Sequence, residues 1–250
     1  MTTAIPVVLA GASGKTGREV GRAIHQAHDM NLIAAIGQNH AGSTLQDLWS
    51  EPAASLTVRR SLDEVDVAYA VMVDFTEHLS CYERIMEAIS RRWDIVVGTT
   101  GFTAEERVAI ARAVEHYHVG AVLIANFSLG AWVMEQLAKQ ASRYFKKAEI
   151  LEAHADTKKD KPSGTAKRMA QILAESWETA PDMIPAHAIR LPGMVAHQAV
   201  VFGASGQILT LRHDVHDRSA YAQGVLASIR KVSDFRGQVV QDLGDIMGSD

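Results

Sequence analysis

A glycine-rich segment near the N-terminus constrains the fold of this chain more than any other feature. Residues 5–10 (Ile-Pro-Val-Val-Leu-Ala) are the short apolar run of a buried strand, and residues 18–28 have the pattern of a helix. Between them, glycines spaced by two residues make a tight turn, let a pyrophosphate approach the backbone and let the helix pack closely. We therefore predict a dinucleotide-binding turn formed by Gly11, Ala12, Ser13, Gly14, Lys15, Thr16 and Gly17.

Spacing excludes two other nucleotide motifs. Gly14-Lys15-Thr16 looks like the end of a P-loop, but that motif requires a glycine five positions before Gly14, where Leu9 stands. A short-chain dehydrogenase has a catalytic tyrosine followed four residues later by lysine. None of the five tyrosines has a lysine at that offset.

Strand-like and helical runs alternate up to about residue 126, which predicts an α/β fold with a parallel sheet covered by helices on both faces. Strands are expected to end near Asp74 and Gly98, and a further strand over residues 120–125 precedes Asn126. Ligands of such sheets bind beyond the carboxyl ends of the strands, so these polar endings should face the cofactor. Thr103 and Glu106 predict a capping box for a helix that runs to about Tyr117.

The cofactor preference is not decided by the second strand. A site that prefers NAD commonly has a carboxylate at the end of this strand, but residues 37–40 (Gly-Gln-Asn-His) contain none. The missing charge would not repel the 2'-phosphate of NADPH, and Lys15 would attract it. NADPH is therefore expected to be tolerated, and both NADPH and NADH remain candidates.

A second motif lies between a strand over residues 148–153 and a helix over residues 166–177. Histidine, present here as His154, is the side-chain type whose unperturbed pKa lies near neutrality, and Lys158 supplies a positive charge or a proton. Ser163 can cap the helix, whose first turn favours a carboxylate or phosphate. The pattern is typical of a site that binds a small acid and protonates it. The alternative is a surface histidine beside a solvated lysine-rich loop.

Composition indicates an ordinary soluble protein. The 250 residues are 47% hydrophobic and 22% charged, and the net charge of -4 gives no footprint for nucleic acid. No apolar run approaches the roughly 18 residues of a membrane span. A single cysteine, Cys81, fits a reducing cytoplasm, and its helical pattern with Leu79, Ile85 and Ile89 indicates packing.

Two histidine pairs have the spacing of metal ligands, His116 with His118 and His213 with His216. Neither comes with the cysteine or carboxylate cluster that would complete a zinc site. No metal is therefore expected.

Several of these motifs together resemble the dihydrodipicolinate reductase (4-hydroxy-tetrahydrodipicolinate reductase) family of bacterial lysine and diaminopimelate synthesis. The similarity runs nearly from end to end. The matching segments are residues 11–17, Val73-Asp-Phe-Thr76, Val97-Gly-Thr-Thr-Gly101, Ala125-Asn-Phe-Ser128, Lys158-x-Asp160-x-Pro-Ser-Gly-Thr165, and Arg190-Leu-Pro-Gly193 with His197.

The resemblance implies a Rossmann-type dinucleotide-binding domain over residues 1–126 and 217–250, with an α+β substrate and oligomerisation domain over residues 127–216. It implies reduction of a cyclic dicarboxylic imine by NADPH or NADH in a homotetramer. His154 would be the proton donor and Lys158 a second donor. The nicotinamide end would meet Gly98, Thr99, Thr100, Ala125, Asn126 and Phe127, and a substrate carboxylate would meet Gly164 and Thr165.

The chain departs from the family pattern at three places. The family usually has a second histidine where this chain has Ala155, and a small residue where this chain has Lys161. It also usually has an acid near the position of Gly37, where this chain has none. Two alternatives therefore stay open. One is a related reductase of another cyclic or unsaturated carboxylic acid, and the other is a non-catalytic nucleotide sensor, which would have no need of His154 and Lys158.

Overall fold

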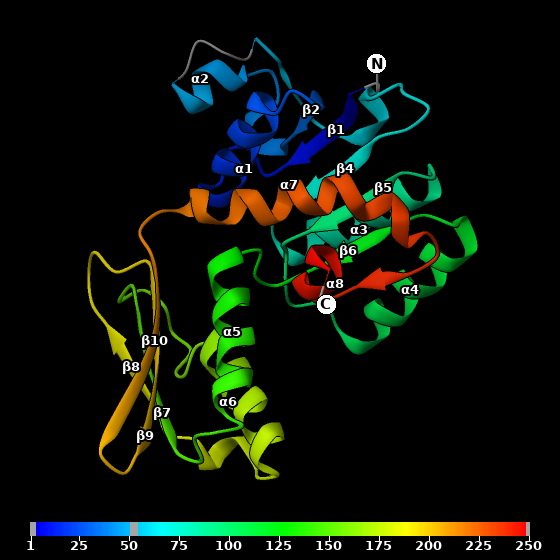
Figure 1. The fold of residues 1–250 in the computed structure, drawn as a ribbon. Coiled ribbons are helices and arrows are strands. Elements are labelled where there is room, and N and C mark those ends of the chain that lie inside the picture. The colour runs from blue at the N-terminus through cyan, green and yellow to red at the C-terminus, as the bar shows by residue number, and fades with distance from the viewer. Residues whose placement is uncertain (1–3, 51–54, 249–250) are drawn as a thin grey trace. The chain divides into compact units, whose positions relative to one another are not determined.

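The computed structural model describes residues 4–50 and 55–248, which form two compact units (Figure 1). The first unit runs up to Ser128 and resumes at Tyr221, and the second comprises Leu129–Ala220. The chain therefore leaves the first unit once and returns to it once. Each unit has its own sheet, and each is described by itself.

The first unit is built on a seven-stranded sheet in which all neighbouring strands are parallel. The strand order β11-β6-β5-β4-β1-β2-β3 reverses direction between β1 and β4. This doubly wound arrangement confirms the predicted fold class. The strands are β1 (Ile5–Ala10), β2 (Met30–Ile36), β3 (Val58–Arg59), β4 (Val71–Asp74), β5 (Asp94–Val97), β6 (Ala121–Leu123) and β11 (Val239–Val240).

The central strands of this sheet are covered on both faces, which explains their uninterrupted apolar sequences. Residues 7–10 of β1 and residues 71–73 of β4 are fully buried. A strand that exposes neither face needs apolar side chains at consecutive positions, whereas a half-exposed strand alternates. The sequence of β1 is therefore informative about the whole layer, because it already requires helices on both sides.

Helices of the first unit begin and end close to their predicted positions. The capping box is present, since Thr103 Oγ1 accepts from Glu106 N at 3.2 Å and Glu106 Oε2 accepts from Thr103 N at 2.8 Å. The helix it starts ends at Tyr117 as expected. The helices are α1 (Lys15–Gln26), α2 (Leu45–Trp49), α3 (His78–Ser90), α4 (Ala104–Tyr117), α7 (Ala222–Lys231) and α8 (Leu243–Met247).

Two expectations for these helices need correction. Helix α1 begins three residues before the predicted Arg18, because Gly14 adopts extended backbone angles and serves as the N-cap. Cys81 is buried in α3 as predicted, but Leu79, which was expected to pack with it, is 76% exposed. Residues two apart on a helix point in different directions, so Leu79 cannot share the buried face of Cys81.

The second unit is a four-stranded mixed sheet with two helices. Strand β7 is parallel to β8 and antiparallel to β9, in the order β10-β9-β7-β8. This confirms the expected second α+β unit. Its elements are α5 (Leu129–Ala141), β7 (Ala148–His154), α6 (Gly164–Trp177), β8 (Ala186–Arg190), β9 (Ala196–Ala204) and β10 (Gln207–Val215).

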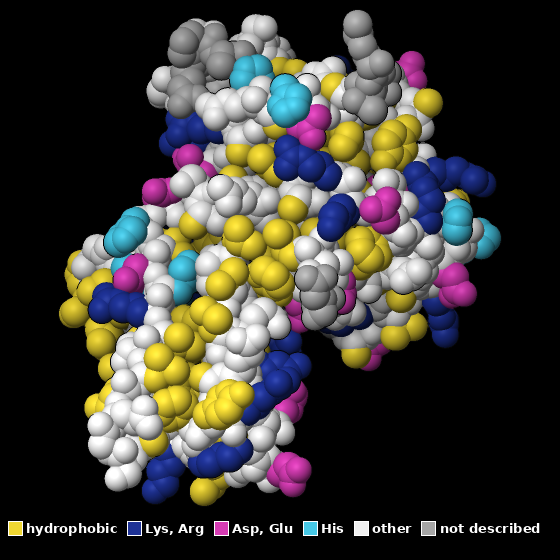
Figure 2. Space-filling view, in the orientation of Figure 1, with side chains coloured by type: hydrophobic (Ala, Val, Ile, Leu, Met, Phe, Trp, Pro, Cys, Tyr) yellow, Lys and Arg dark blue, Asp and Glu magenta, His cyan; other side chains and the backbone are white. Residues whose placement is uncertain are grey.

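The core of the second unit forms where the helices cover one face of the sheet. Ile150 and Phe202 point inward and pack with Met169 and Leu173 of α6. On the opposite face of β7, Leu151 is 39% exposed. Figure 2 shows further hydrophobic side chains at the surface where Figure 1 draws α5. Within the second unit, α5 and α6 therefore cover one face of the sheet.

Short 3-10 helices join several of these elements. No helix among the described residues is long and apolar enough to span a membrane. The 3-10 helices are Gln38–His40, Leu62–Glu64, Pro181–Met183, Arg218–Tyr221 and Val232–Phe235.

Candidate active site

Four strands of the first unit end side by side. Ala10 of β1 pairs with Asp74 of β4, Asp74 pairs with Val97 of β5, and Val97 pairs with Leu123 of β6. The segments that follow these residues therefore leave the sheet along the same edge. This is the edge at which doubly wound sheets bind ligands, and it includes the reversal of strand order between β1 and β4.

The glycine-rich turn follows β1, and neither Gly11 nor Gly17 has room for a side chain. Gly11 has φ +88°, and a Cβ atom there would lie 2.7 Å from the carbonyl oxygen of Phe75. A Cβ atom on Gly17 would lie 2.1 Å from the carbonyl oxygen of Gly11, so only glycine lets α1 approach the turn this closely. Ser13, Gly14 and Lys15 are exposed at the start of the helix.

This turn fits the pyrophosphate of a dinucleotide. The first N–H groups of α1 have no partners within the helix, and the positive end of the helix dipole lies beside them. Because the glycines leave the backbone bare, an anion can reach those N–H groups directly. Thr16 and Lys15 stand in the first turn of α1, where they can add side-chain donors.

A buried carboxylate fixes the segments after β4 and β5. Asp74 forms an ion pair with Arg84 and accepts hydrogen bonds from the N–H and hydroxyl of Thr76 at 2.8 and 2.6 Å. Thr99 Oγ1 lies 3.3 Å from the same carboxylate. A Cβ atom on Gly98 would lie 2.1 Å from the ring of Phe75. The predicted Gly98, Thr99 and Thr100 therefore sit in a segment with little freedom.

The segment after β6 is anchored against the same region. Phe127 is buried, and its ring centroid lies 5.8 Å from that of Phe75. Asn126 uses its side-chain oxygen to accept from Ser128 N at 3.0 Å, while Ala125 is exposed. The structure thus brings the residues predicted to meet the nicotinamide to adjacent strand ends of one unit.

Two arginines beside the end of β2 were missed by the sequence analysis. Gly37 N donates to Arg59 O at 2.9 Å, which places Arg59 and Arg60 next to the position where a ribose-binding acid was sought. Glu64 is close as well, since its carboxylate accepts from Arg60 N at 3.2 Å. The pairing of β2 with β3 brings these residues together, and no local sequence motif predicts this contact.

In the second unit, β7 ends in a histidine held by a buried glutamate. Nδ1 of His154 lies 2.6 Å from Oε2 of Glu152, two residues earlier on the same strand. Glu152 is 1% exposed. Because both side chains point to the helix-covered face, the strand presents the imidazole there, with Nε2 as the ring nitrogen not engaged by the carboxylate.

Arg190 of β8 completes this arrangement. Its two terminal nitrogens bind the two oxygens of Glu152 at 2.8 and 2.7 Å, a bidentate pair that leaves little of the guanidinium exposed. The second nitrogen also donates to the carbonyl oxygen of Asp160 at 2.7 Å. Arg190 therefore joins the strand that holds His154 to the loop that holds Lys158.

The loop after β7 carries the predicted second donor. Lys158 Nζ lies 2.8 Å from Oδ1 of Asp160, and Lys158 N donates to Ala155 O at 3.0 Å in a turn. The hydrogen bond from Lys158 lowers the pKa of the Asp160 carboxyl. Lys158 is partly exposed, so its ammonium group can exchange this partner for a ligand.

The loop ends at the N-terminus of α6. Ser163 caps the helix, with Oγ accepting from Ala166 N at 3.3 Å, and Thr165 Oγ1 lies 3.1 Å from the same oxygen. Helix α6 begins at Gly164, two residues before the predicted start. No atom lies within 4 Å of where a Cβ of Gly164 would be, so the first turn of the helix is open to a ligand.

Charge at this site is balanced by buried contacts. Burial by itself raises the pKa of Glu152, but hydrogen bonds from Arg190, His154 and Ser163 N outweigh it, and the net pKa is lowered. Ser163 N donates to Oε1 of Glu152 at 3.1 Å, so the same carboxylate also supports the start of α6. A carboxylate held ionised in this way keeps the imidazole, the guanidinium and the helix cap in one arrangement.

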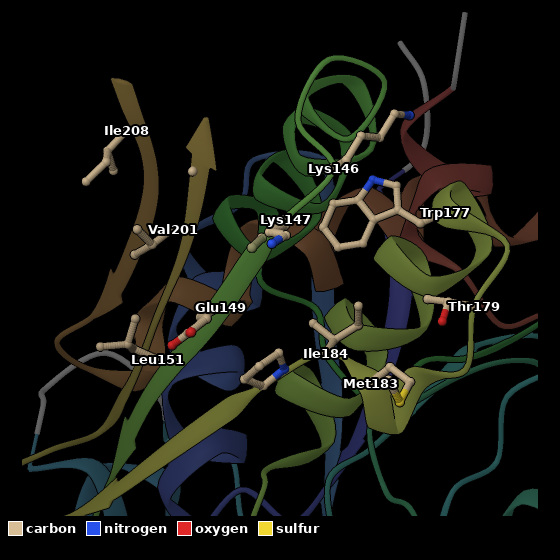
Figure 3. A pocket seen from close by; sticks show the side chains of 13 residues that line it. Lys146, Lys147, Glu149, Leu151, Trp177, Thr179, Met183, Ile184, Val201 and Ile208 are labelled. Carbon is tan, nitrogen blue, oxygen red and sulfur yellow. The ribbon is translucent and has the colours of Figure 1, made fainter. Parts of the chain in front are cut away.

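A separate hollow of about 710 Å³ lies at the other end of the second sheet (Figure 3). It is lined by Lys146, Lys147 and Trp177, together with Leu151 and Ile208 of the exposed sheet face. Lys147 immediately precedes β7 and His154 ends it, a separation of about 20 Å at the usual rise of a strand. None of the predicted site residues lines this hollow.

Neither histidine pair belongs to a metal-binding group in the described parts of the chain. His118 is the C-cap of α4, and His116 stacks edge-on against Tyr117. His216 lies edge-on to His197, with ring centroids 6.0 Å apart. His213 packs against Gly130, and burial lowers its pKa. Among the described residues, no group of three or more His, Cys, Asp or Glu side chains could hold a metal ion.

Comparisons with known proteins agree across the whole chain. A family model described as "Dihydrodipicolinate reductase, N-terminus" matches residues 5–127, and one described as "Dihydrodipicolinate reductase, C-terminus" matches residues 130–247. The 4-hydroxy-tetrahydrodipicolinate reductase of Thermosynechococcus vestitus is 42% identical and covers 93% of each chain. That of Rippkaea orientalis is 41% identical, covering 94% of this chain and 95% of its own.

Solved structures show the same architecture. A dipicolinate-bound dihydrodipicolinate reductase from Paenisporosarcina sp. TG-14 has a TM-score of 0.81 at 32% identity, covering 98% of this chain and 100% of its own. An amine dehydrogenase from Mycobacterium smegmatis has a TM-score of 0.63 at 12% identity, covering 95% and 94%. The second likeness shows the fold alone.

Proposed function

This chain belongs to the dihydrodipicolinate reductase family of NAD(P)H-dependent oxidoreductases, and we propose that it reduces 4-hydroxy-tetrahydrodipicolinate to tetrahydrodipicolinate for lysine and diaminopimelate synthesis. One observation carries the proposal. His154, held on a buried carboxylate, and Lys158 both lie on the segment that leads into the open N-terminus of α6. That combination suits a small acid that must be bound and protonated.

The work is divided between the two parts of the chain. We assign the dinucleotide to residues 1–126 with 217–250, through the glycine-rich turn and the strand ends around Gly98 and Asn126. We assign the substrate to residues 127–216. The cradle that a Cβ atom would fill at Gly11 and Gly17 supports the first assignment. The ionic arrangement around Glu152 supports the second.

When bound, a reduced nicotinamide supplies the hydride. The residues of this chain supply the rest. Gly164 and Thr165, at the start of α6, hold a substrate carboxylate, and Lys158 stabilises its negative charge. The substrate loses its hydroxyl group as water, and the hydride adds to a ring carbon. The substrate nitrogen then carries an electron pair that takes a proton from His154 or Lys158.

Oxidation of NADPH and of NADH by the purified protein tests this function, with the freshly made product of the preceding aldol synthase as the substrate. Turnover with either cofactor is expected, and the two rates rank them. Tight nucleotide binding without turnover would contradict the proposed reaction. It would favour the non-catalytic sensor or a reductase of another acid.

A reductase of another cyclic or unsaturated acid is the second candidate, and Ala155 favours it. The family's usual histidine is absent there, and Ala155 offers only a methyl group and the carbonyl that accepts from Lys158 N. Ala155→His tests this candidate. A large rise in activity on the lysine-pathway imine would show that position 155 limits the reaction, and no change would count against the idea.

We propose that the protein is a cytoplasmic homotetramer assembled through the uncovered face of the second sheet. That face exposes Leu151, Ile189 and Ile208. Leu151 and Ile208 also line the hollow and are labelled in Figure 3. An exposed apolar sheet face of this kind is typical of an interface. Cys81 is a buried free thiol, which suits a reducing compartment.

Size-exclusion chromatography with light scattering of Ile208→Asp tests the assembly. We expect the variant to dissociate to smaller species with its circular dichroism unchanged. Val108→Asp is the control, because Val108 is also apolar and exposed, at 50% against 74% for Ile208, but lies on α4 of the first unit. A wild-type protein of monomeric mass at micromolar concentration would contradict the proposal.

A further inference from the structure

A largely buried ion pair contacts His154 and the loop that carries Lys158. Glu152 and Arg190 are 38 positions apart in sequence and meet across the parallel pair of β7 and β8. Little of either side chain reaches solvent, with side-chain exposures of 0% for Glu152 and 5% for Arg190. Burying two charges is costly, and a buried pair is often no more stabilising than apolar residues in its place. The pair therefore calls for a role beyond stability.

The contacts of Glu152 point to His154. The carboxylate makes four hydrogen bonds with three residues, His154, Ser163 and Arg190, and the shortest is the 2.6 Å bond to Nδ1 of the histidine. A carboxylate on Nδ1 requires a proton there in the neutral ring. Nε2 is then the nitrogen that gives up or takes a proton, and the ring is held in one orientation.

The contacts of Arg190 point to Lys158. Its guanidinium is shared between the Glu152 carboxylate and the carbonyl oxygen of Asp160, and Asp160 is also the ion-pair partner of Lys158. The loop between β7 and α6 is thus attached to the same buried pair as the histidine. An arginine can serve both acceptors because its donors are fixed in a planar fork, whereas a lysine cannot.

We propose that Glu152 is a positioning residue for the reduction, acting on His154 through Nδ1 and, by way of Arg190, on the loop that carries Lys158. The effect of Glu152 on catalysis rests on the proposed function, whereas its effect on the orientation and tautomer of His154 does not. Glu152 sets the proton-bearing nitrogen of the histidine before any substrate arrives.

A spectroscopic measurement tests the geometry without any activity assay. Nitrogen-detected NMR of the histidine rings in the full-length protein is expected to show neutral His154 as the Nδ1–H tautomer. In Glu152→Gln the signal should move toward the Nε2–H tautomer that free histidine prefers. Finding Nε2–H in the wild-type protein would overturn the proposal even if the reductase activity is robust.

A double-mutant cycle tests the consequence. We expect Glu152→Gln to lower kcat by about 10- to 100-fold in the wild-type background, as for other groups that orient a catalytic side chain. In a His154→Ala background the same change should lower kcat by less than about twofold, because the group it acts on is gone. Equal losses in both backgrounds would show a merely structural role and overturn the proposal.

Two further variants keep the test interpretable. If Glu152→Gln does not fold with Arg190 unpaired, the double variant Glu152→Gln with Arg190→Met removes both charges and goes through the same cycle. Glu149→Gln is the matched control. Glu149 lies on the same strand as Glu152 and also binds a histidine, His187, at 2.8 Å. Both side chains of this pair are more than half exposed. Its kcat should equal that of the wild type.

If the protein reduces no imine at all, the proposed function fails and the tautomer result still stands or falls alone. If it does reduce the imine, the pH dependence of kcat gives a second reading. Loss of the Glu152 carboxylate should change the pH profile of kcat in Glu152→Gln, whereas Glu149→Gln should keep the wild-type profile.

Discussion

The candidate dinucleotide site of the first unit and the candidate substrate site of the second unit are built from different kinds of group. In the first unit the site is made of backbone, because a Cβ atom at position 11 or 17 would lie only 2.7 or 2.1 Å from a backbone carbonyl oxygen. In the second unit the site is side chains, held by the buried charges of Glu152 and Arg190. A backbone site is sensitive to added volume, and a side-chain site is sensitive to removed charge.

The largest expected effect is in the second unit. Lys158→Ala should lower kcat by about 10²- to 10⁴-fold, the usual contribution of a group that donates a proton or stabilises charge. Steady-state kinetics measures this loss, and fluorescence titration with NADPH should show an unchanged dissociation constant. Weakened nucleotide binding in this variant would break the division of labour between the units.

A smaller loss, of another kind, is expected from added volume in the first unit. Gly17→Ala places a Cβ atom 2.1 Å from the Gly11 carbonyl, so the turn must open and NADPH affinity should fall at least about tenfold. Overpacking of this kind also costs about 1–3 kcal/mol of stability. Gly203→Ala is the control, since nothing lies within 4 Å of its Cβ position. Isothermal titration should separate the two variants, and equal affinities would contradict the backbone account.

A modest effect is expected at Lys15, where the first unit does use a side chain. Lys15→Ala should raise the KM for NADPH by about five- to tenfold, roughly the value of one charge-assisted contact to a phosphate. The KM for NADH should change by less than about twofold, because that cofactor has no 2'-phosphate. Equal changes for both cofactors would place Lys15 at the pyrophosphate.

The smallest effect concerns the pH dependence of stability. The pKa of Glu152 is lowered in the folded protein, so its contribution to stability is present above its ordinary pKa of 4.5 and is lost as the pH falls through the lower folded value. Thermal unfolding of the wild type between pH 6 and pH 3 should therefore steepen below about pH 4.5. Glu152→Gln should show a shallower decline, and identical profiles would contradict the assigned charge state.

The same contrast explains how far the sequence could be interpreted. The turn at residues 11–17 was predictable because its spacing is local and each glycine has its own steric reason. The Ser163 cap and the Thr103 capping box were predictable for the same reason, since they are completed within three residues. Local patterns carry their physical cause in the sequence itself.

The partners of Glu152 were not predictable in this way. Arg190 belongs to a recognisable segment, but its contact with Glu152 depends on which strands pair and in which register. A partial signal was present, because a glutamate that follows apolar positions on the inward face of a strand must have a cation when it is buried. Arg59 beside Gly37 was missed for the same reason, since this contact depends on the pairing of β2 with β3 and not on a local motif.

Gly164 has a consequence for engineering this protein. It is the first residue of α6, its backbone is not left-handed, and the fold leaves empty space where its side chain would be. Replacement by alanine at such a position commonly raises stability by about 0.4–1 kcal/mol, since the unfolded chain loses freedom. A search for heat-resistant variants alone would therefore select this substitution, and the methyl group would occupy the space that we assign to the substrate carboxylate.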